Sequence, residues 1–500
     1  MLGKVKSALP RGTSARLIDV ECDIAAGMPY CEIVGNLAIS VKESRDRVRT
    51  AMRNSGIHLP PSRVTVNLSP SSIRKEGTHF DLAIAAAMLL AMGVITEKNV
   101  EGTAFAGELA LDGSVLRIRA ILPMSITVKE SGLKRFIVPY DNSSEGAVVD
   151  GVEIIGVRTL DECIAYLQGK ISIPKAEKAP VRDFKLPYEF SDVKGQKVLK
   201  RAALVAAASM HNMLIIGPPG AGKSMTASRL PSILPSLNFE ESLEISKIYS
   251  VAGLLSSDNC LIDQRPFRNP HYSISKAAFA GGGANPMPGE MSLASMGVLF
   301  MDEFSLFRQD VIETLRTPLE TGVIRITRSY GDCEYNASFM LVAAMNPCKC
   351  GFYPDRNKCR CSEIDIRRHM SRLSKPIMDR IDICVRAERI GYDEMGSDAD
   401  EYTTAYMKEK VEAALKRQKS RYEGLDFYLN SQVPDAMLRE VCDMTAPARD
   451  ILKMAYDKYD MSARGFNKVL KVARTVADVE GHEIIEEADI CEAVGYKSVI

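Results

Sequence analysis

The sequence has no net charge, no apolar run long enough to cross a membrane and no low-complexity segment. Its 64 lysines and arginines balance 64 aspartates and glutamates, so no overall field favours nucleic acid or membrane, and any basic binding surface must be local. The most apolar stretch, residues 82–95, predicts a buried helix that is too short to span a bilayer. Because no apolar run follows Lys4, Lys6 and Arg11, we expect no secretory signal and no membrane partner, and we expect a cytoplasmic protein.

The chain also offers little sign of disulfide bonding. Without a secretory signal, its twelve cysteines are expected to be reduced thiols or metal ligands. A length of 500 residues, with 46% hydrophobic and 26% charged residues, indicates a globular α/β protein of three or four domains. We expect an α/β unit over 1–170, a proline-containing linker over 171–190, a nucleotide-binding α/β core over 191–395 and helices over 396–500.

The segment Gly217-Pro-Pro-Gly-Ala-Gly-Lys-Ser224 matches the phosphate-loop pattern G-x-x-x-x-G-K-[ST] at every fixed position. The apolar run 213–216 before it predicts a strand, and residues 225–230 predict a helix. Backbone N–H groups of such a loop surround phosphates, Lys223 would reach the β- and γ-phosphates, and Ser224 would hold Mg²⁺. We therefore predict ATP and Mg²⁺ as cofactors, bound by Gly217, Pro218, Pro219, Gly220, Ala221, Gly222, Lys223, Ser224 and Met225.

Two further strands predict catalytic side chains. The apolar run before Asp302 and Glu303 predicts a buried parallel strand whose carboxylates emerge at the ligand-binding edge of the sheet. Asp302 would hold Mg²⁺ through water, and Glu303 would polarise the attacking water. A third strand over 339–344 leads to Asn346, which could position water against the γ-phosphate.

The order of these motifs resembles the AAA+ ATPases, more narrowly the magnesium-chelatase-like branch, and within it the ComM/YifB family. The resemblance covers essentially the whole chain. It rests on Gly195-Gln196, the phosphate loop, Arg265-Pro-Phe-Arg-Asn-Pro-His271, Gly281-Gly-Gly, Gly297-Val-Leu-Phe-Met-Asp-Glu303, Ala343-Ala-Met-Asn-Pro-Cys348, Asp379-Arg380-Ile-Asp382 and Ser462-Ala-Arg464.

The resemblance implies a homo-oligomeric ring, hexameric in the family, with ATP between subunits. It places Gly195 and Gln196 among the nucleotide-binding residues, Arg380 as an arginine finger, and Arg464 as the sensor-2 arginine of a helical lid. Taken alone, either arginine would be explained as well by a surface salt bridge. Three nearby arginines are rival finger candidates, namely Arg367, Arg368 and Arg372.

The first 170 residues resemble the proteolytic domain of Lon, which has a ribosomal-protein-S5-like α+β fold. The matching segments are 75–81 and 107–116. In this register His79 stands where Lon has its nucleophilic serine, and the lysine position falls at or near Leu122. Because a Ser–Lys dyad needs a hydroxyl and an amine, we expect no peptidase activity and an assembly or substrate-guiding role.

Four cysteines lie within fourteen residues after Asn346: Cys348, Cys350, Cys359 and Cys361. They predict a closed tetrahedral Zn²⁺ site, which the resemblance supports, although free thiols remain an alternative. Residues 349–375 hold eight lysines and arginines against three acidic residues. This local patch suits phosphates, or is simply a solvated surface.

Two insertions are expected to point toward the pore of the ring, by analogy with relatives. One spans 265–289, and the other is a hairpin of strands 323–328 and 334–340 that turns at 329–332. Arg325 and Arg328 would lie on an exposed face, and Tyr330 could stack on bases. An ordinary structural hairpin is the alternative.

The sequence therefore predicts an ATP-hydrolysing, ring-forming machine that acts on single-stranded or branched DNA. The resemblance suggests helicase or branch-migration activity in recombination or natural transformation. The main alternative is a chelatase-type remodeller of a protein partner, against which the Lon-like domain argues. A protease is disfavoured by His79 and Leu122.

Overall fold

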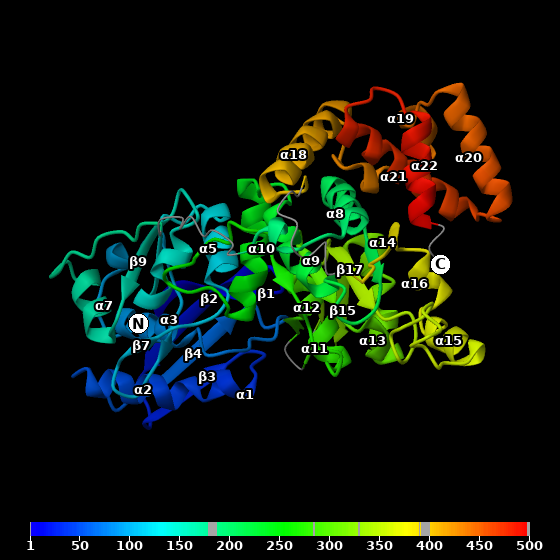
Figure 1. The fold of residues 1–500 in the computed structure, drawn as a ribbon. Helices are drawn as coiled ribbons and strands as arrows, with labels where there is room; N and C mark the ends of the chain where they lie inside the picture. Colours follow the sequence, from blue (N-terminus) through cyan, green and yellow to red (C-terminus); the bar gives the residue numbers. More distant parts are fainter. Residues whose placement is uncertain are drawn as a thin grey trace.

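The computed structural model describes residues 2–178, 188–283, 286–328, 331–389, 391 and 401–497. A mixed sheet organises the N-terminal part, with strand order β3-β4-β2-β1-β5-β8-β9 and α3 against one face (Figure 1). The elements are β1 (Leu2–Arg11), β2 (Ser14–Ala25), β3 (Tyr30–Val34), α1 (Ile39–Lys42), α2 (Ser44–Asn54), β4 (Arg63–Ser69), α3 (Asp81–Ala91), α4 (Glu97–Val100), β5 (Thr103–Phe105), β6 (Glu108–Leu109), β7 (Val115–Leu116), α5 (Ile121–Glu130), β8 (Arg135–Pro139), α6 (Ser143–Gly146), β9 (Glu153–Val157) and α7 (Leu160–Leu167).

Helix α3 is the predicted buried helix of the N-terminal part. All eleven of its residues are buried. It lies so close to β1 that a Cβ on Gly3 would meet the carbonyl oxygen of Ala87 at 2.4 Å. The apolar run therefore becomes a core helix, and no helix within the described residues is long and apolar enough to cross a bilayer.

The central part is built on a five-stranded sheet with order β11-β14-β17-β10-β18, in which every pairing is parallel. Parallel strands bind ligands at their carboxyl edge. The main elements are α8 (Lys197–Ser209), β10 (Met213–Ile216), α9 (Lys223–Arg229), α10 (Phe239–Ala252), β11 (Phe267–Arg268), α11 (Lys276–Ala280), α12 (Glu290–Leu293), β14 (Val298–Met301), α13 (Gln309–Ile312), α14 (Pro318–Thr321), β17 (Met340–Met345), α15 (Glu363–Met370), α16 (Lys375–Met378) and β18 (Ile383–Arg386).

Both predicted insertions form two-stranded ribbons. The first pairs β12 (Gly281–Gly282) with β13 (Met287–Pro288), and the second pairs β15 (Val323–Arg328) with β16 (Gly331–Asn336). The second strand of the hairpin therefore differs from the predicted 334–340, because Met340 already belongs to the core strand β17. Tyr330 lies outside the described residues.

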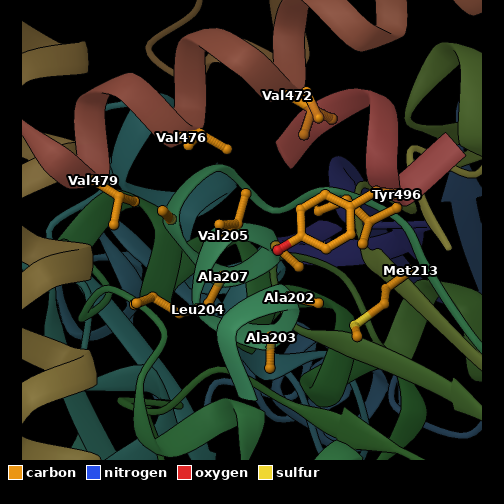
Figure 2. Close-up of a cluster of buried hydrophobic side chains, with 14 of the residues drawn as sticks. Ala202, Ala203, Leu204, Val205, Ala207, Met213, Val472, Val476, Val479 and Tyr496 are labelled. Atoms are coloured by element: carbon orange, nitrogen blue, oxygen red, sulfur yellow. The ribbon is translucent and has the colours of Figure 1, made fainter. Parts of the chain in front are cut away.

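The C-terminal part is helical, as expected, and consists of α18 (Thr404–Arg421), α19 (Leu438–Val441), α20 (Ala446–Lys458), α21 (Ala463–Glu480) and α22 (Glu487–Lys497). Figure 2 shows how it packs on the core: side chains of α21 and α22 meet the alanine-rich helix α8. The side chains involved include Val472, Val476, Val479 and Tyr496 on one side and Ala202, Ala203, Val205 and Ala207 on the other.

A partly buried carboxylate also joins the helical part to the sheet. Asp382, just before β18, accepts from the backbone N–H of Asn212 at 3.1 Å and from His211 Nδ1 at 3.3 Å. It also pairs with Lys468 Nζ of α21 at 2.9 Å. Burial alone would raise the pKa of Asp382, but Lys468 and His211 outweigh it and hold the pKa well below its usual range. The helical part is thus anchored at the amino edge of the sheet.

Candidate nucleotide-binding site

The phosphate loop leaves β10 and enters α9 in the order that the sequence predicted. Gly217 has no room for a side chain, since a Cβ there would meet the carbonyl oxygen of Ala387 at 2.5 Å. Gly220 and Gly222 have φ values of +77° and +78°, in the left-handed region that favours glycine. The loop conformation therefore needs glycine for two different reasons, close backbone approach and positive φ.

Lys223 is folded back over this loop. Its Nζ donates to the carbonyl oxygens of Gly217 at 2.7 Å and Pro218 at 2.9 Å, and to Asn346 Oδ1 at 3.1 Å. Burial lowers the pKa of Lys223, and the negative charges of Asp302 and Glu303 partly oppose this effect. The lysine therefore joins the carboxyl ends of β10 and β17 in one site.

The predicted magnesium ligands meet directly. Ser224 Oγ donates to Asp302 Oδ2 at 2.6 Å, although the two residues are 78 positions apart. A hydroxyl and a carboxylate oxygen at the end of a phosphate loop fit the oxygen ligands that Mg²⁺ prefers. Ser224 would hold Mg²⁺ there and Asp302 would hold it through water, and the ion would neutralise phosphate charge.

Glu303 has a strained backbone. Its φ is +49°, unusual for a residue with a side chain, and its N–H donates to Asp302 Oδ1 at 2.8 Å. Such strain clusters at functional sites. Glu303 and Asn346 line one cavity of about 560 Å³ together with two of the rival finger candidates, Arg368 and Arg372. Those two arginines therefore belong to the subunit's own site.

Asn346 is held in place by a residue that the sequence analysis missed. His369 Nε2 donates to the backbone carbonyl oxygen of Asn346 at 3.0 Å, and His369 lines the same cavity as Glu303. A histidine beside two arginines in a basic stretch carried no distinguishing signal in the sequence, because its role depends on the fold of α15.

The four cysteines predicted as a metal site come together. Cys348 Sγ lies 3.3 Å from Cys350 Sγ and 3.7 Å from Cys359 Sγ, and all four Sγ atoms lie within 4.8 Å of one another. Tetrahedral zinc with Zn–S bonds of about 2.3 Å would place sulfurs about 3.8 Å apart. A hydrogen bond from the Phe352 backbone, above all, lowers the pKa of Cys350. These residues could hold a metal.

This cysteine knuckle, residues 348–361, packs on the phosphate loop. A Cβ added to Gly351 would meet Pro219 Cδ at 2.6 Å and Asn346 Cγ at 3.7 Å. Gly351 also has a φ of +82°. The knuckle therefore contacts the loop and Asn346 at once, which the sequence spacing alone did not reveal.

The segment with Gly195 and Gln196 lies beside the same loop. Val193 Cγ1 would be 3.8 Å from a Cβ at Gly222. Gln196 caps α8 in the left-handed conformation, and its side-chain amide donates to the backbone carbonyl of Glu388 beyond β18. The segment that contains both predicted residues thus approaches the loop through Val193, while Gln196 contacts the chain beyond β18.

Arg380 and Arg464 lie elsewhere. Both line a cleft of about 730 Å³ that also contains Asp382 and Lys468, and no phosphate-loop residue borders it. Arg380 precedes β18, at the amino edge of the sheet, opposite the edge that carries the loop. Its guanidinium pairs with Glu320 Oε2 at 2.5 Å and donates to the backbone oxygen of Arg316 at 3.0 Å.

Comparisons with known proteins match the whole length of the chain to one family. A family model described as magnesium chelatase, subunit ChlI, matches residues 189–395. A second, described as subunit ChlI of Mg-chelatase, matches 20–142, and one for the ChlI C-terminal region matches 401–497. The competence protein ComM of Haemophilus influenzae is 35% identical over 506 residues, which cover 100% of this chain and 98% of that protein.

The chain belongs to the ComM/YifB family of magnesium-chelatase-like AAA+ ATPases. The YifB protein of Escherichia coli is 37% identical over 489 residues, or 98% of this chain and 95% of its own. Lon protease 2 of Bacillus subtilis is 29% identical over 169 residues, 30% of each chain. The family implies ATP and Mg²⁺ as cofactors and an oligomeric assembly, and the loop, Ser224 and Asp302 fit them.

The contact between knuckle and loop predicts a specific effect of Gly351→Ala. The added methyl group would push Pro219 and weaken nucleotide binding about tenfold, since overpacking typically costs about 1–3 kcal/mol. Titration with a fluorescent ADP analogue measures this. Gly424→Ala is a matched control, because Gly424 has the same φ of +82° but nothing within 4 Å of an added Cβ. Equal affinities in the two variants would contradict the coupling.

Proposed function

We propose that this protein is a ring-forming, ATP-driven machine that moves on single-stranded or branched DNA, as a helicase or branch-migration factor in recombination or natural transformation. The main support for a ring is that the proposed catalytic residues are divided between two edges of one sheet. Lys223, Glu303 and Asn346 lie at the carboxyl edge, while Arg380 and Arg464 lie at the amino edge. A second subunit is needed to bring both groups to one nucleotide.

The residues of the carboxyl edge have separate roles in this proposal. Glu303 orients and polarises the attacking water, and Asn346, fixed by His369, positions it in line with the γ-phosphate. Lys223 must leave the carbonyl oxygens of Gly217 and Pro218 to reach the phosphates. Arg380 of one subunit exchanges Glu320 for the γ-phosphate of its neighbour and stabilises the transition-state charge.

Support for DNA as the substrate comes from a relative named as a competence protein and from the hairpin β15–β16. The Arg325 side chain is 75% exposed there, although it pairs with Glu334 Oε2 at 2.6 Å. The basic stretch 349–375 supports DNA binding less than its charge suggested.

Lys349 and Arg368 of this stretch line the cavity of Glu303, and Arg356 pairs with Glu363. The phosphates nearest to the stretch would therefore be those of the nucleotide.

A chelatase-type remodeller of a protein partner remains the second candidate. The N-terminal part no longer argues against it, because the family model that matches residues 20–142 is itself described as a chelatase subunit. What separates the two functions is the response to DNA. We propose in addition that the N-terminal part is not a peptidase, since His79 is buried and Leu122 is packed among Val148, Val149 and Cys260.

The DNA proposal predicts that ATP hydrolysis is stimulated several-fold by single-stranded DNA or a four-way junction. The steady-state ATPase rate without DNA and with each DNA measures this, with Glu303→Gln as the blank. That variant keeps the loop and should bind ATP but hydrolyse it at least about a hundredfold more slowly, because it cannot polarise water. An active enzyme that ignores DNA would favour the remodeller, and normal hydrolysis by Glu303→Gln would refute the role of Glu303.

The division of the site predicts complementation between two inactive variants. Lys223→Ala should fail to bind nucleotide productively, and Arg380→Ala should bind ATP without turning it over. When the two are mixed, an intact Arg380 from one subunit can act on ATP held by an intact Lys223 of the next. ATPase activity in the mixture should therefore exceed that of either variant alone. If mixing restores nothing, while wild-type protein added to each variant still forms active rings, Arg380 does not act between subunits.

We also propose that the cysteine knuckle holds zinc. Metal analysis should find about one zinc per chain, and replacement by Co²⁺ should give the visible spectrum of a tetrahedral thiolate site. Cys359→Ser with Cys361→Ser should lose the metal, whereas Cys491→Ser, an exposed cysteine outside the cluster, should keep it. Zinc content that is the same in both variants would contradict this site.

A further inference from the structure

A cavity of about 440 Å³ lies between the N-terminal part and the ATPase core. Its N-terminal wall is formed by the end of β1, the loop before α3 and the segment 117–120. Its other wall comes from α10, β13 and β16, so both ribbons of the core contribute. His79, the residue at the position of the Lon nucleophile, lines it. The cavity therefore lies where the resemblance to Lon places the nucleophile, with an imidazole in place of the serine hydroxyl.

The acidic side chains that line the cavity have partners, whereas some of its basic side chains do not. Its two carboxylates have partners: Glu76 pairs with Arg74 at 3.0 Å, and Glu108 accepts from the hydroxyl of Thr78. Three other guanidinium groups line the cavity, those of Arg11, Arg117 and Arg119. Across the part of the chain that the structure describes, no carboxylate pairs with any of the three. Arg117 donates to the backbone carbonyl oxygen of Leu255, and its charge opposes the burial that raises the pKa of Glu145. Among the described residues, Arg11 and Arg119 therefore supply the positive charge of the cavity that has no acidic partner.

His79 adds a polar atom without a partner. Among the described residues, nothing hydrogen-bonds to its Nε2, although the atom is buried. Burial lowers the pKa of His79 to about 3. The ring is therefore neutral at physiological pH, and it repels neither an anionic nor a cationic ligand. His79 Nε2 is thus an orphaned nitrogen in the wall of a cavity that also holds Arg11 and Arg119, and a missing polar ligand is consistent with it.

The cavity is also connected to the ribbons of the ATPase core. Tyr335 Oη of β16 donates to the carbonyl oxygen of Pro286, just before β13, at 2.7 Å. A Cβ on Gly12, in the turn after β1, would lie 3.7 Å from Cys333 Cβ of β16. A ligand in this cavity would thus touch the N-terminal part and the ribbon that is expected to face the pore.

We propose that this cavity binds phosphate groups, presented by a nucleic-acid strand or by a free nucleotide. Guanidinium groups pair with phosphate oxygens through two parallel hydrogen bonds, better than an ammonium group can. The volume is in the range of small-ligand sites and accommodates a nucleotide. The strand as the source of the phosphate rests on the proposed function, whereas the free nucleotide does not.

The test compares two double variants of the full-length protein. Arg11→Gln with Arg119→Gln removes two cavity charges that come from different elements and are both exposed, so folding should be retained. Arg49→Gln with Arg53→Gln removes two exposed charges of α2 outside the cavity and serves as the matched control. Fluorescence anisotropy measures binding of a labelled oligo-dT of about 20 nucleotides at salt concentrations from about 50 to about 200 mM. Calorimetry measures binding of thymidine monophosphate.

If the strand supplies the phosphate, the cavity variant should bind oligo-dT about tenfold more weakly than the control. Its salt dependence should fall by about 1.4 in slope, for two lost contacts. If a free nucleotide supplies it, only binding of thymidine monophosphate should fall, and the site would stand even if ATPase activity proved insensitive to DNA. Equal binding of both probes by the cavity variant and the control, or no binding of either probe by the unsubstituted protein, would overturn the proposal.

Discussion

The parallel pairing of five short strands is the constraint on which the rest of this structure depends. Because all strands run the same way, the side chains that follow β10, β14 and β17 meet at one edge, and those that precede β18 lie at the other. Strand β10 has four residues, so the two edges are about 13 Å apart at about 3.3 Å per residue. Lys223 and Arg380 therefore lie at opposite edges of the sheet within one subunit.

The carboxyl edge is organised around Asn346. Its side chain accepts from Lys223, its backbone carbonyl accepts from His369, and its Cγ lies near Gly351 of the knuckle. A change in the knuckle thus reaches the lysine through one residue. The four cysteines follow the third strand directly, so a metal bound to them would fix the chain where Asn346 is held.

Much of the nucleotide site could be predicted from the sequence because its determinants are local. The glycines, Lys223 and Ser224 are fixed by the loop itself, and the apolar runs before Asp302 and Asn346 place both residues at a known edge. The separation of Arg380 and Arg464 from the loop could not be predicted from spacing, since it depends on how α21 docks through Lys468 and Asp382.

The predicted range of β16 extended too far because β17 begins only four residues after β16 ends. The contact of Gly351 with Pro219 and the cavity beside His79 arise between segments far apart in sequence.

The N-terminal part is tied to the ATPase core by α10, and the nature of that contact limits how the two can move. Ser250 Oγ donates to Glu145 Oε1 at 2.5 Å, and Glu145 also accepts from the backbone N–H of Leu122 at 3.2 Å. The N–H of Ala120 donates to the Ser250 carbonyl at 3.0 Å. Burial raises the pKa of Glu145 despite these hydrogen bonds. Ionisation of Glu145 is therefore disfavoured in the folded state. Its contribution to the free energy of unfolding is present at low pH, and it is lost as pH rises from the pKa of the unfolded chain through the higher pKa of the folded protein.

A contact made of hydrogen bonds to a buried carboxyl is directional and shielded from salt, unlike a surface ion pair. It holds the start of α5 against the end of α10, next to Arg119 of the cavity. Displacement of α10 during ATP turnover would consequently carry the segment 117–122 with it. Leu122, at or near the position where the resemblance places the Lon lysine, thus lies in the contact between the N-terminal part and the ATPase core, where it packs against Val148, Val149 and Cys260.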